Sequence, residues 1–281
     1  MEGRRNWMEM PDEIMGGMIL GRLDAVEILT KTQKVCMNWR RICKKDPEMW
    51  KMIRFDYSEN DFEKFCEEAV NCSSGELIRR ICKDPHVFYT RKDFEKLCKQ
   101  AVYRSSGGLI DISLKGFGTD HLLDFISRSS SKLNRLCLTN CHKITGCGLN
   151  NALERLPHLE TLELSYIYVY AKDIEAIGRN CPHLKSFKIR INFLSCNTIA
   201  CAIANSMPAL RHLELIATRG DNDVLHYLEL IGTWVGNDGV RAILNGCPHL
   251  ESLHILNCFH TLLDSDLEKL CRERITDFQF S

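Results

Sequence analysis

The sequence lacks an excess of charge of either sign, because its 281 residues include 37 Lys and Arg against 37 Asp and Glu. A neutral chain has no overall field to attract nucleic acid or an anionic membrane, so we expect neither as a partner. No apolar run approaches the roughly 20 residues that are needed to cross a bilayer. With 44% hydrophobic and 26% charged residues, the composition is that of a folded globular chain.

The sequence also lacks the short motifs of enzymes and metal sites. It has no Gly-x-Ser-x-Gly, no phosphate-binding Gly-rich loop and no His-Glu-x-x-His, and its 15 cysteines include no Cys-x-x-Cys. We therefore expect no enzyme, no cofactor and no metal. The first residues, Met1-Glu2-Gly3-Arg4, have no apolar core of a secretory signal behind them. We expect reduced thiols and a cytoplasmic or nuclear protein.

One apolar pattern recurs along the chain, namely Leu-x-x-Leu-x-Leu with Ile or Phe also allowed. Its seven starts are Leu109, Leu133, Leu159, Leu184, Leu210, Leu225 and Leu250. The starts are 24, 26, 25, 26, 15 and 25 residues apart. Apart from the 15, every spacing lies in the range of about 20–29 residues that is typical of leucine-rich repeats. Pro-His-Leu or Pro-Ala-Leu marks four of the starts, where a proline stops the preceding helix.

Each repeat unit predicts a short strand followed by a helix, and one unit cannot bury its apolar face alone. Stacked units give an α/β solenoid with parallel strands inside and helices outside, which we place at residues 109–281. Residues 212–218 and 227–233 are near copies of each other, offset by 15. This offset leaves too little chain for a helical crossover, so we expect an irregular insert near residues 211–225 and a local defect there.

The segment before the solenoid contains another duplication. Residues 61–75 resemble residues 93–107, and both copies place apolar residues at helical spacing. The second copy leads into the strand pattern at Ile112, whereas the first has Arg80 where that strand needs an apolar residue. We therefore predict that residues 51–108 form a helical linker with an internal duplication.

The first fifty residues predict three short helices. The first begins at Pro11, the second at the capping pattern Asp24-x-x-Glu27, and the third runs from Val35 through Ile42. About 40 residues make a marginal fold, and three tryptophans add more apolar surface than so small a module can bury. We expect a partner protein to cover its apolar face.

This segment resembles an F-box. The resemblance lies in Met10-Pro11-x-Glu13-Ile14, Ile19-Leu20-x-x-Leu23, Glu27-Ile28-Leu29 and Val35-Cys36-x-x-Trp39-Arg40, within residues 7–50. An F-box before leucine-rich repeats is similar to the plant F-box/leucine-rich-repeat proteins, and this similarity covers most of the chain. The family usually opens with Leu-Pro, so Met10 is a departure, as are residues 51–92 and the insert.

The resemblance implies a non-catalytic, substrate-recognition subunit of an SCF-type ubiquitin ligase. In that family the F-box docks a Skp-type adaptor, and through it a cullin, while the repeats hold a substrate protein. The implied adaptor-binding residues are Met10, Pro11, Ile14, Leu20, Leu23, Ile28, Leu29, Val35, Cys36 and Trp39. Several of these could instead only pack the three helices together. We favour contact with the adaptor for Pro11 and Leu20.

Alternate residues of the predicted strands should face the inside of the solenoid and are candidates for substrate contact. They include Arg135, Glu163, Lys188, Arg190, Glu214, Tyr227, Glu229 and His254. Their mixed charge indicates no ligand class, and an ordinary solvated surface explains them equally well. A leucine-rich-repeat scaffold that assembles no ligase is the main alternative. A degenerate family member, with duplications from a mistaken join of the coding sequence, is another.

Overall fold

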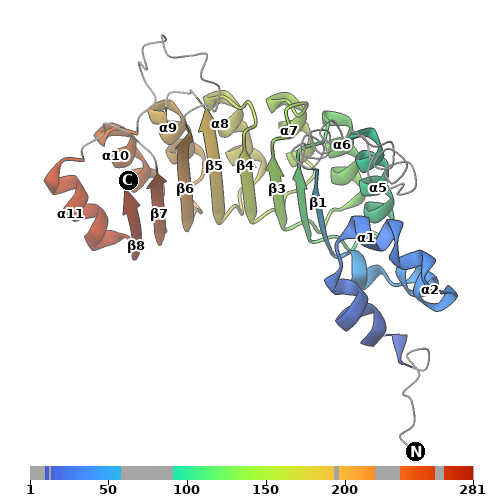
Figure 1. Cartoon of the computed structure of the whole chain (residues 1–281). Helices are drawn as coiled ribbons and strands as arrows, with labels where there is room; N and C mark the ends of the chain where they lie inside the picture. Colours follow the sequence, from blue (N-terminus) through green and yellow to red (C-terminus); the bar gives the residue numbers. More distant parts are fainter. Residues whose placement is uncertain are drawn as a thin grey trace, which may run out of the picture.

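The computed structural model describes residues 10–12, 14–57, 91–192, 196–218, 235–256 and 263–280. Within them, one parallel sheet of eight strands follows the order of the chain (Figure 1). The strands are β1 (Met52–Asp56), β2 (Asp111–Lys115), β3 (Arg135–Thr139), β4 (Thr161–Ser165), β5 (Ser186–Asn192), β6 (His212–Thr218), β7 (Ser252–Leu256) and β8 (Asp277–Phe280).

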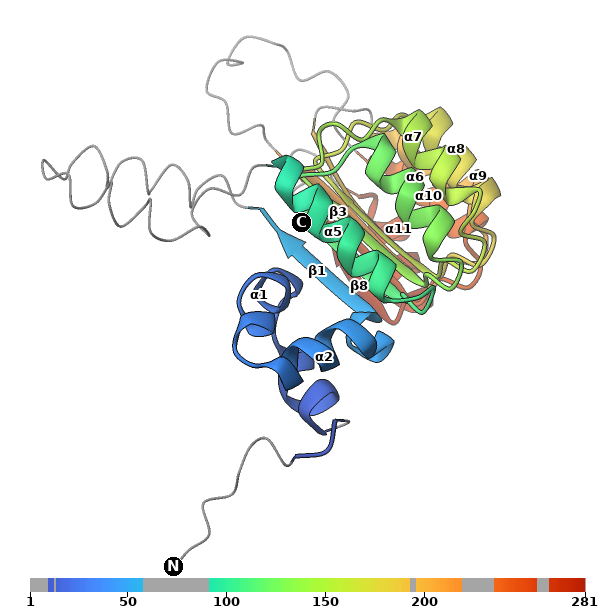
Figure 2. The same ribbon diagram turned by 90° about the vertical axis from the view of Figure 1, so that its right-hand side faces the viewer.

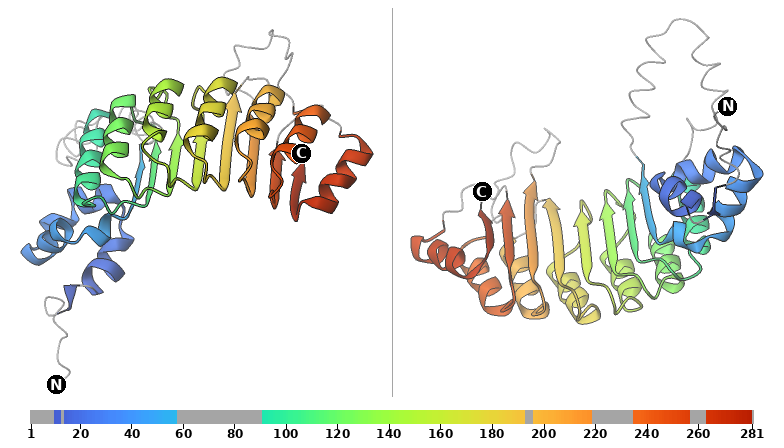
Figure 3. Two further views of the ribbon diagram at one scale, coloured as in Figure 1. Left: turned by 180° about the vertical axis from the view of Figure 1, so that it is seen from behind. Right: turned by 90° about the horizontal axis from the view of Figure 1, so that it is seen from below.

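Helices follow the strands and cover one face of this sheet. They are α5 (Arg91–Arg104), α6 (Asp120–Ser129), α7 (Gly146–Leu153), α8 (Ala171–Asn180), α9 (Cys196–Ser206), α10 (Asn237–Gly246) and α11 (Ser265–Arg274). The right-hand view of Figure 3 shows an arc with the strands on its inner side and the helices on its outer side. The predicted α/β leucine-rich-repeat solenoid is confirmed.

The repeat pattern sets the register of the sheet. Ile112, Leu136, Leu162 and Phe187 are successive partners across β2 to β5, and each is at most 1% exposed. Because side chains alternate along a strand, this register turns all the apolar positions toward the helices. The intervening polar residues then form the open inner face of the arc.

The sheet begins before the predicted boundary at residue 109. β1 lies in the segment that we expected to be a helical linker, where Ile53 pairs with Ile112 and Phe55 with Leu114. Trp50 stands where the other units have their first leucine, and it is 1% exposed. Trp50-x-x-Ile53-x-Phe55 is therefore a first repeat in which aromatic residues replace leucines.

The sheet also ends later than the predicted repeats. β8 adds a strand beyond β7, with Leu253 paired to Phe278 and Ile255 to Phe280. Ile275 lies three residues before Phe278 and is 3% exposed. The unit thus keeps the repeat spacing with Ile and Phe at the leucine positions, which the sequence pattern already allows.

The two duplications are only partly described. Of the first, residues 61–75 lie outside the described residues, and the second copy is α5, whose Phe94, Cys98 and Ala101 are buried as predicted. In the segment near 211–225, residues 212–218 form the regular strand β6, and Leu213 pairs directly with Leu253 of β7. The predicted repeat that begins at Leu225 lies outside the described residues.

The N-terminal module consists of short helices beside β1 (Figure 2). They are the π-helix η2 (Ile14–Ile19), the helices α1 (Ala25–Thr30) and α2 (Met37–Lys45), and the 3-10 turns η3 (Leu20–Arg22), η4 (Thr32–Lys34) and η5 (Pro47–Trp50). The predicted cap of the second helix is present, because Asp24 Oδ1 accepts a hydrogen bond of 2.7 Å from the backbone N–H of Glu27. Such a cap satisfies one of the free donors at the helix start.

Trp50 and Arg104 join the module to the solenoid. The indole Nε1 of Trp50 donates to the carbonyl of Cys43 in α2 at 3.0 Å. Arg104, at the end of α5, lies over the Trp50 ring at 5.3 Å and donates from Nη2 to Gln33 Oε1 at 3.2 Å. These contacts tie α2 and η4 of the module to α5 of the solenoid.

Candidate functional site

The predicted docking residues of the N-terminal module divide into exposed and buried sets. Val35 is 61% exposed and Ile14 is 41% exposed, and Pro11 is also exposed. Met10, Leu23, Leu29, Cys36 and Trp39 are half-buried. Leu20 and Ile28 are 0% and 2% exposed, so the structure places them in the core of the module and corrects their prediction as contact residues.

Local structure holds the exposed residues in place. The Cys36 thiol accepts a hydrogen bond of 3.4 Å from the backbone N–H of Trp39 and so caps α2. Val35 and Met37 flank this capping residue, and Met37 is 80% exposed. The F-box resemblance does not include position 37 among its apolar residues, so the sequence pattern did not indicate Met37.

An ion pair fastens the start of the module to α2. Arg41 donates from Nη1 and Nη2 to the two carboxylate oxygens of Asp12, both at 2.6 Å. The hydrogen bond from Arg41 lowers the pKa of Asp12, and the same bond raises the pKa of Arg41. The exposed Pro11 precedes this anchored residue, so it is held near α2 together with Ile14.

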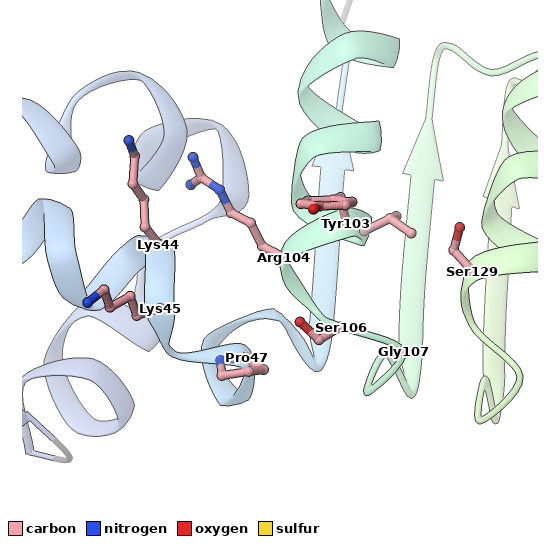
Figure 4. Close-up of a pocket in the computed structure, with 9 residues that line it drawn as sticks. Lys44, Lys45, Pro47, Tyr103, Arg104, Ser106, Gly107 and Ser129 are labelled. Carbon is pink, nitrogen blue, oxygen red and sulfur yellow. The ribbon is translucent and has the colours of Figure 1, made fainter.

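A cleft of about 370 Å³ lies where the module meets the solenoid (Figure 4). Arg104 is its most constrained side chain, since its Nη1 is buried without a hydrogen-bond partner among the described residues, and burial lowers its pKa. Lys44 and Lys45 also line the cleft, but both point away from Ser106 and Ser129. The cations therefore do not converge on one point, and the cleft indicates no ligand.

The predicted substrate-contact residues that the structure describes lie on the inner face of the sheet. Most of them already form ion pairs, either with one another or with a further acidic residue. Lys188 Nζ lies 2.8 Å from Glu214 Oε2, and His254 Nε2 lies 2.7 Å from Asp277 Oδ2. Tyr227 and Glu229, the other two predicted residues, lie outside the described residues.

Arg135 is the centre of the strongest of these contacts. It donates to Asp111 Oδ1 at 3.0 Å and to Glu163 Oε1 at 2.6 Å. Burial lowers the pKa of Arg135, but the hydrogen bonds and charges of Glu163 and Asp111 outweigh burial, and the pKa is raised. One cation faces two carboxylates here, so Arg135 is fully engaged and is not free to bind a ligand charge. Sequence reasoning missed Asp111 and Asp277, which only strand register brings to Arg135 and His254.

Arg190 differs from the other predicted cations. Its register partners are Ser165 on β4 and Ile216 on β6, neither of which carries a charge. Its guanidinium lies over the Tyr166 ring at 5.6 Å, and Nη1 donates to the Tyr166 hydroxyl at 3.4 Å. Among the described residues no carboxylate forms an ion pair with Arg190, in contrast to Arg135.

Most of the described cysteines are buried or half-buried, whereas Cys147 and Cys201 are exposed. Cys141 occupies the ninth position of its repeat, where its buried thiol donates to the Phe117 carbonyl at 2.7 Å. Burial raises its pKa to about 12, so it stays a protonated thiol at neutral pH. In the part of the chain that the structure describes, no three His, Cys, Asp or Glu side chains gather as a metal site.

Known structures resemble this chain only loosely. A Bacteroides fragilis protein of known structure has 13% identity and a TM-score of 0.39, covering 82% of this chain and 76% of that one. The leucine-rich-repeat protein LegL7 of Legionella pneumophila has 12% identity and a TM-score of 0.30, covering 71% and 72%. At these scores the likeness carries no information about function. Across the described helices, none is long and apolar enough to span a bilayer.

Similarity in sequence is much stronger. No protein-family model matches the chain. F-box/LRR-repeat protein 23 of Arabidopsis thaliana is 38% identical over 98% of this chain, which spans 53% of that relative's length. F-box protein SKIP19 of Arabidopsis thaliana is 36% identical over 96% of this chain and 75% of its own length. With these relatives, the N-terminal helical module and the solenoid behind it, the chain belongs to the plant F-box/leucine-rich-repeat family.

Proposed function

We propose that this chain is the substrate-recognition subunit of a Skp–cullin–F-box ubiquitin ligase. Its N-terminal module would dock a Skp-type adaptor, and through it a cullin, while the solenoid holds a substrate protein. Membership of the family supports a receptor role in general. The observation that carries the finer proposal is the set of exposed apolar side chains on the module, Ile14, Val35 and Met37.

Exposed apolar residues on one small module favour a protein partner. Ile14, Val35 and Met37 are 41%, 61% and 80% exposed, although the module has its own buried core around Leu20 and Ile28. Side chains that become fully desolvated at the centre of an interface each contribute about 2 kcal/mol or more. Three such anchors would contribute about 6 kcal/mol, so a micromolar complex, at about 8 kcal/mol, needs further contacts around them.

The chain itself would perform no covalent chemistry in this role. It would hold the substrate near the charged ubiquitin carrier and so raise the effective concentration of substrate lysines. The ties from Trp50 and Arg104 to α2 and η4 suit this task, because they fix the docking module relative to the solenoid. A fixed geometry keeps a bound substrate within reach of the carrier.

Co-purification with a plant Skp-type adaptor tests the proposal. Val35→Asp combined with Met37→Asp should reduce binding about 30-fold or more, since two charges would enter an apolar interface. Both side chains are exposed, so the double variant should still melt cooperatively. Leu20→Ala is not suitable, because Leu20 is buried and its loss would unfold the module.

Leu270→Asp is the matched control. Leu270 is 46% exposed on α11, at the far end of the solenoid from the module, and its substitution should leave adaptor binding unchanged. A well-folded wild-type chain that binds no adaptor would contradict the proposal. It would leave the leucine-rich-repeat scaffold without ligase assembly as the better description.

A further inference from the structure

Three successive repeats share a left-handed turn directly after their strands. The turn residues are Gly116 after β2, Asn140 after β3 and Tyr166 after β4, with φ values of 79°, 54° and 56°. Their backbone N–H groups donate across the sheet, for example Gly116 to Thr139 and Asn140 to Ser165, both at 2.9 Å. In these units the left-handed residue makes the cross-strand hydrogen bond that follows the strand.

Tyrosine is the unexpected residue in this series. Glycine has no Cβ to clash in a left-handed turn, and asparagine tolerates the turn, whereas a bulky side chain there is uncommon and strained. Tyr166 is held by Arg190, whose guanidinium covers the ring and whose Nη1 donates to the hydroxyl. Strained residues of this kind are concentrated at binding sites, where the surroundings hold them.

Tyr166 begins a short extended segment of alternating tyrosines. Tyr168 and Tyr170 are 67% and 55% exposed, while Ile167 and Val169 between them are 7% and 1% exposed. The backbone N–H of Tyr170 donates to Asp173 Oδ2 at 2.9 Å, which fixes the end of the segment to α8. The buried residues and this bond hold the tyrosines in a rigid row at the carboxyl end of β4.

We name this surface, made of Tyr166, Tyr168, Tyr170 and Arg190, the tyrosine edge. Trp, Tyr and Arg are enriched at the energetic centres of protein interfaces, and a tyrosine buries a large area at little entropic cost. Arg190 also carries a charge that no described carboxylate pairs with, and its Nε is buried without a hydrogen-bond partner among the described residues. A guanidinium group that stacks on an aromatic ring can bind a carboxylate through two hydrogen bonds.

We propose that the tyrosine edge binds an acidic segment of the substrate protein, with a carboxylate on Arg190 and apolar contacts on Tyr168 and Tyr170. The inference rests on the proposed receptor function and names the class of substrate surface. A nucleic acid fits less well, because its affinity needs several phosphate contacts, whereas the edge has one unpaired cation on a neutral chain.

Two synthetic peptide pools test the charge preference. One pool is a mixed 12-residue library with four fixed glutamates, and the other has glutamine at those positions. The immobilised full-length chain should retain the glutamate pool about tenfold more than the glutamine pool, and Arg190→Gln should remove this difference. Equal retention of both pools by the wild type would overturn the inference, as would an unchanged preference in Arg190→Gln. Retention of a labelled oligothymidine above that of the glutamate pool would also overturn it.

Two tyrosine variants test the apolar part. Tyr168→Ser combined with Tyr170→Ser should lower retention of the glutamate pool about tenfold, whereas Tyr103→Ser, at a site 80% exposed on α5, should not change it. Tyr166→Asn places in this turn the residue that Asn140 has in the preceding unit. It should melt no lower than wild type yet retain the pool less, and undiminished retention would contradict a binding role.

Adaptor binding by the same wild-type preparation separates this inference from the proposed function. Equal retention of the two pools by a chain that binds the adaptor would overturn the tyrosine edge and leave the ligase role intact. A clear glutamate preference in a chain that binds no adaptor would overturn the substrate receptor, and with it the description of the acidic segment as substrate.

Discussion

Replacement of Trp50 by phenylalanine should weaken the joint between the N-terminal module and the solenoid. Trp50 is 1% exposed, donates from its indole to the Cys43 carbonyl and lies under the Arg104 guanidinium. Phenylalanine keeps an aromatic ring at the first position of this repeat but has no N–H. The variant therefore isolates the polar contacts of Trp50 from most of its apolar burial.

The expected loss can be assembled from these contacts. An unpaired buried carbonyl costs about 1–3 kcal/mol, and a weaker cation–π contact with the half-buried Arg104 adds about 0.5–1 kcal/mol. We expect a loss of about 3 kcal/mol in the free energy of unfolding once the smaller ring is included. With a slope of about 3 kcal/mol per M urea, the midpoint should fall by about 1 M.

Urea unfolding followed by far-ultraviolet circular dichroism measures this loss without relying on tryptophan fluorescence. Arg104→Met in the wild type and in Trp50→Phe completes a double-mutant cycle, whose coupling energy should be about 0.5–1 kcal/mol. Tyr103→Phe is the control, because Tyr103 neighbours Arg104 but is 80% exposed. A change below about 0.5 kcal/mol in Trp50→Phe, or no coupling to Arg104, would refute the assigned role of this joint.

Gly116→Ala should lower the melting temperature by about 5 °C or more, because the new Cβ would clash with the Tyr57 carbonyl oxygen at a φ of +79°; calorimetry showing no change would contradict this packing. Asp24→Ala removes the cap of α1 and should cost about 1 kcal/mol, read from the urea midpoint, with Asp24→Ser largely preserving it. The hydrogen bond from His254 lowers the pKa of Asp277, so its ionised form stabilises the fold above the unfolded pKa near 4. Wild type should therefore lose more stability than Asp277→Asn as the pH falls from about 4 through the lower folded pKa, and parallel acid unfolding curves would speak against this contact.

The solenoid was predictable where its units keep aliphatic residues. The strands β2 to β7 follow the Leu-x-x-Leu-x-Leu pattern. Each unit buries the same face, so its apolar residues recur at a regular spacing that can be read from the sequence. The first strand was missed because Trp50 stands where the other units have their first leucine, whereas the last unit, which starts at Ile275, fits the pattern. Terminal units of a repeat protein pack against a neighbour on one side only, so they tolerate different residues at the same positions.

The functional surfaces were less predictable than the fold. Short helices do not reveal which of their apolar residues face inward, so Leu20 and Val35 looked alike in the sequence but are 0% and 61% exposed. The pairing of Arg135 with Asp111 depends on a strand register across 24 residues of chain. The left-handed turn at Tyr166 depends on the repeat as a whole, since a tyrosine alone does not indicate it.

The alignment of neighbouring strands does not depend on the number of residues that connect them. Lys115 meets Asp56 across 59 residues and Arg211 meets Glu251 across 40, whereas Lys185 meets Glu160 across 25. Both long connections leave from the carboxyl end of a strand, the same edge of the sheet that carries Tyr166 and Arg190. Related genes can therefore lengthen, duplicate or exchange these connections without altering the alignment of any strand. Under the proposed binding of substrate at the tyrosine edge, changes in these connections would alter recognition and leave the leucine positions in place.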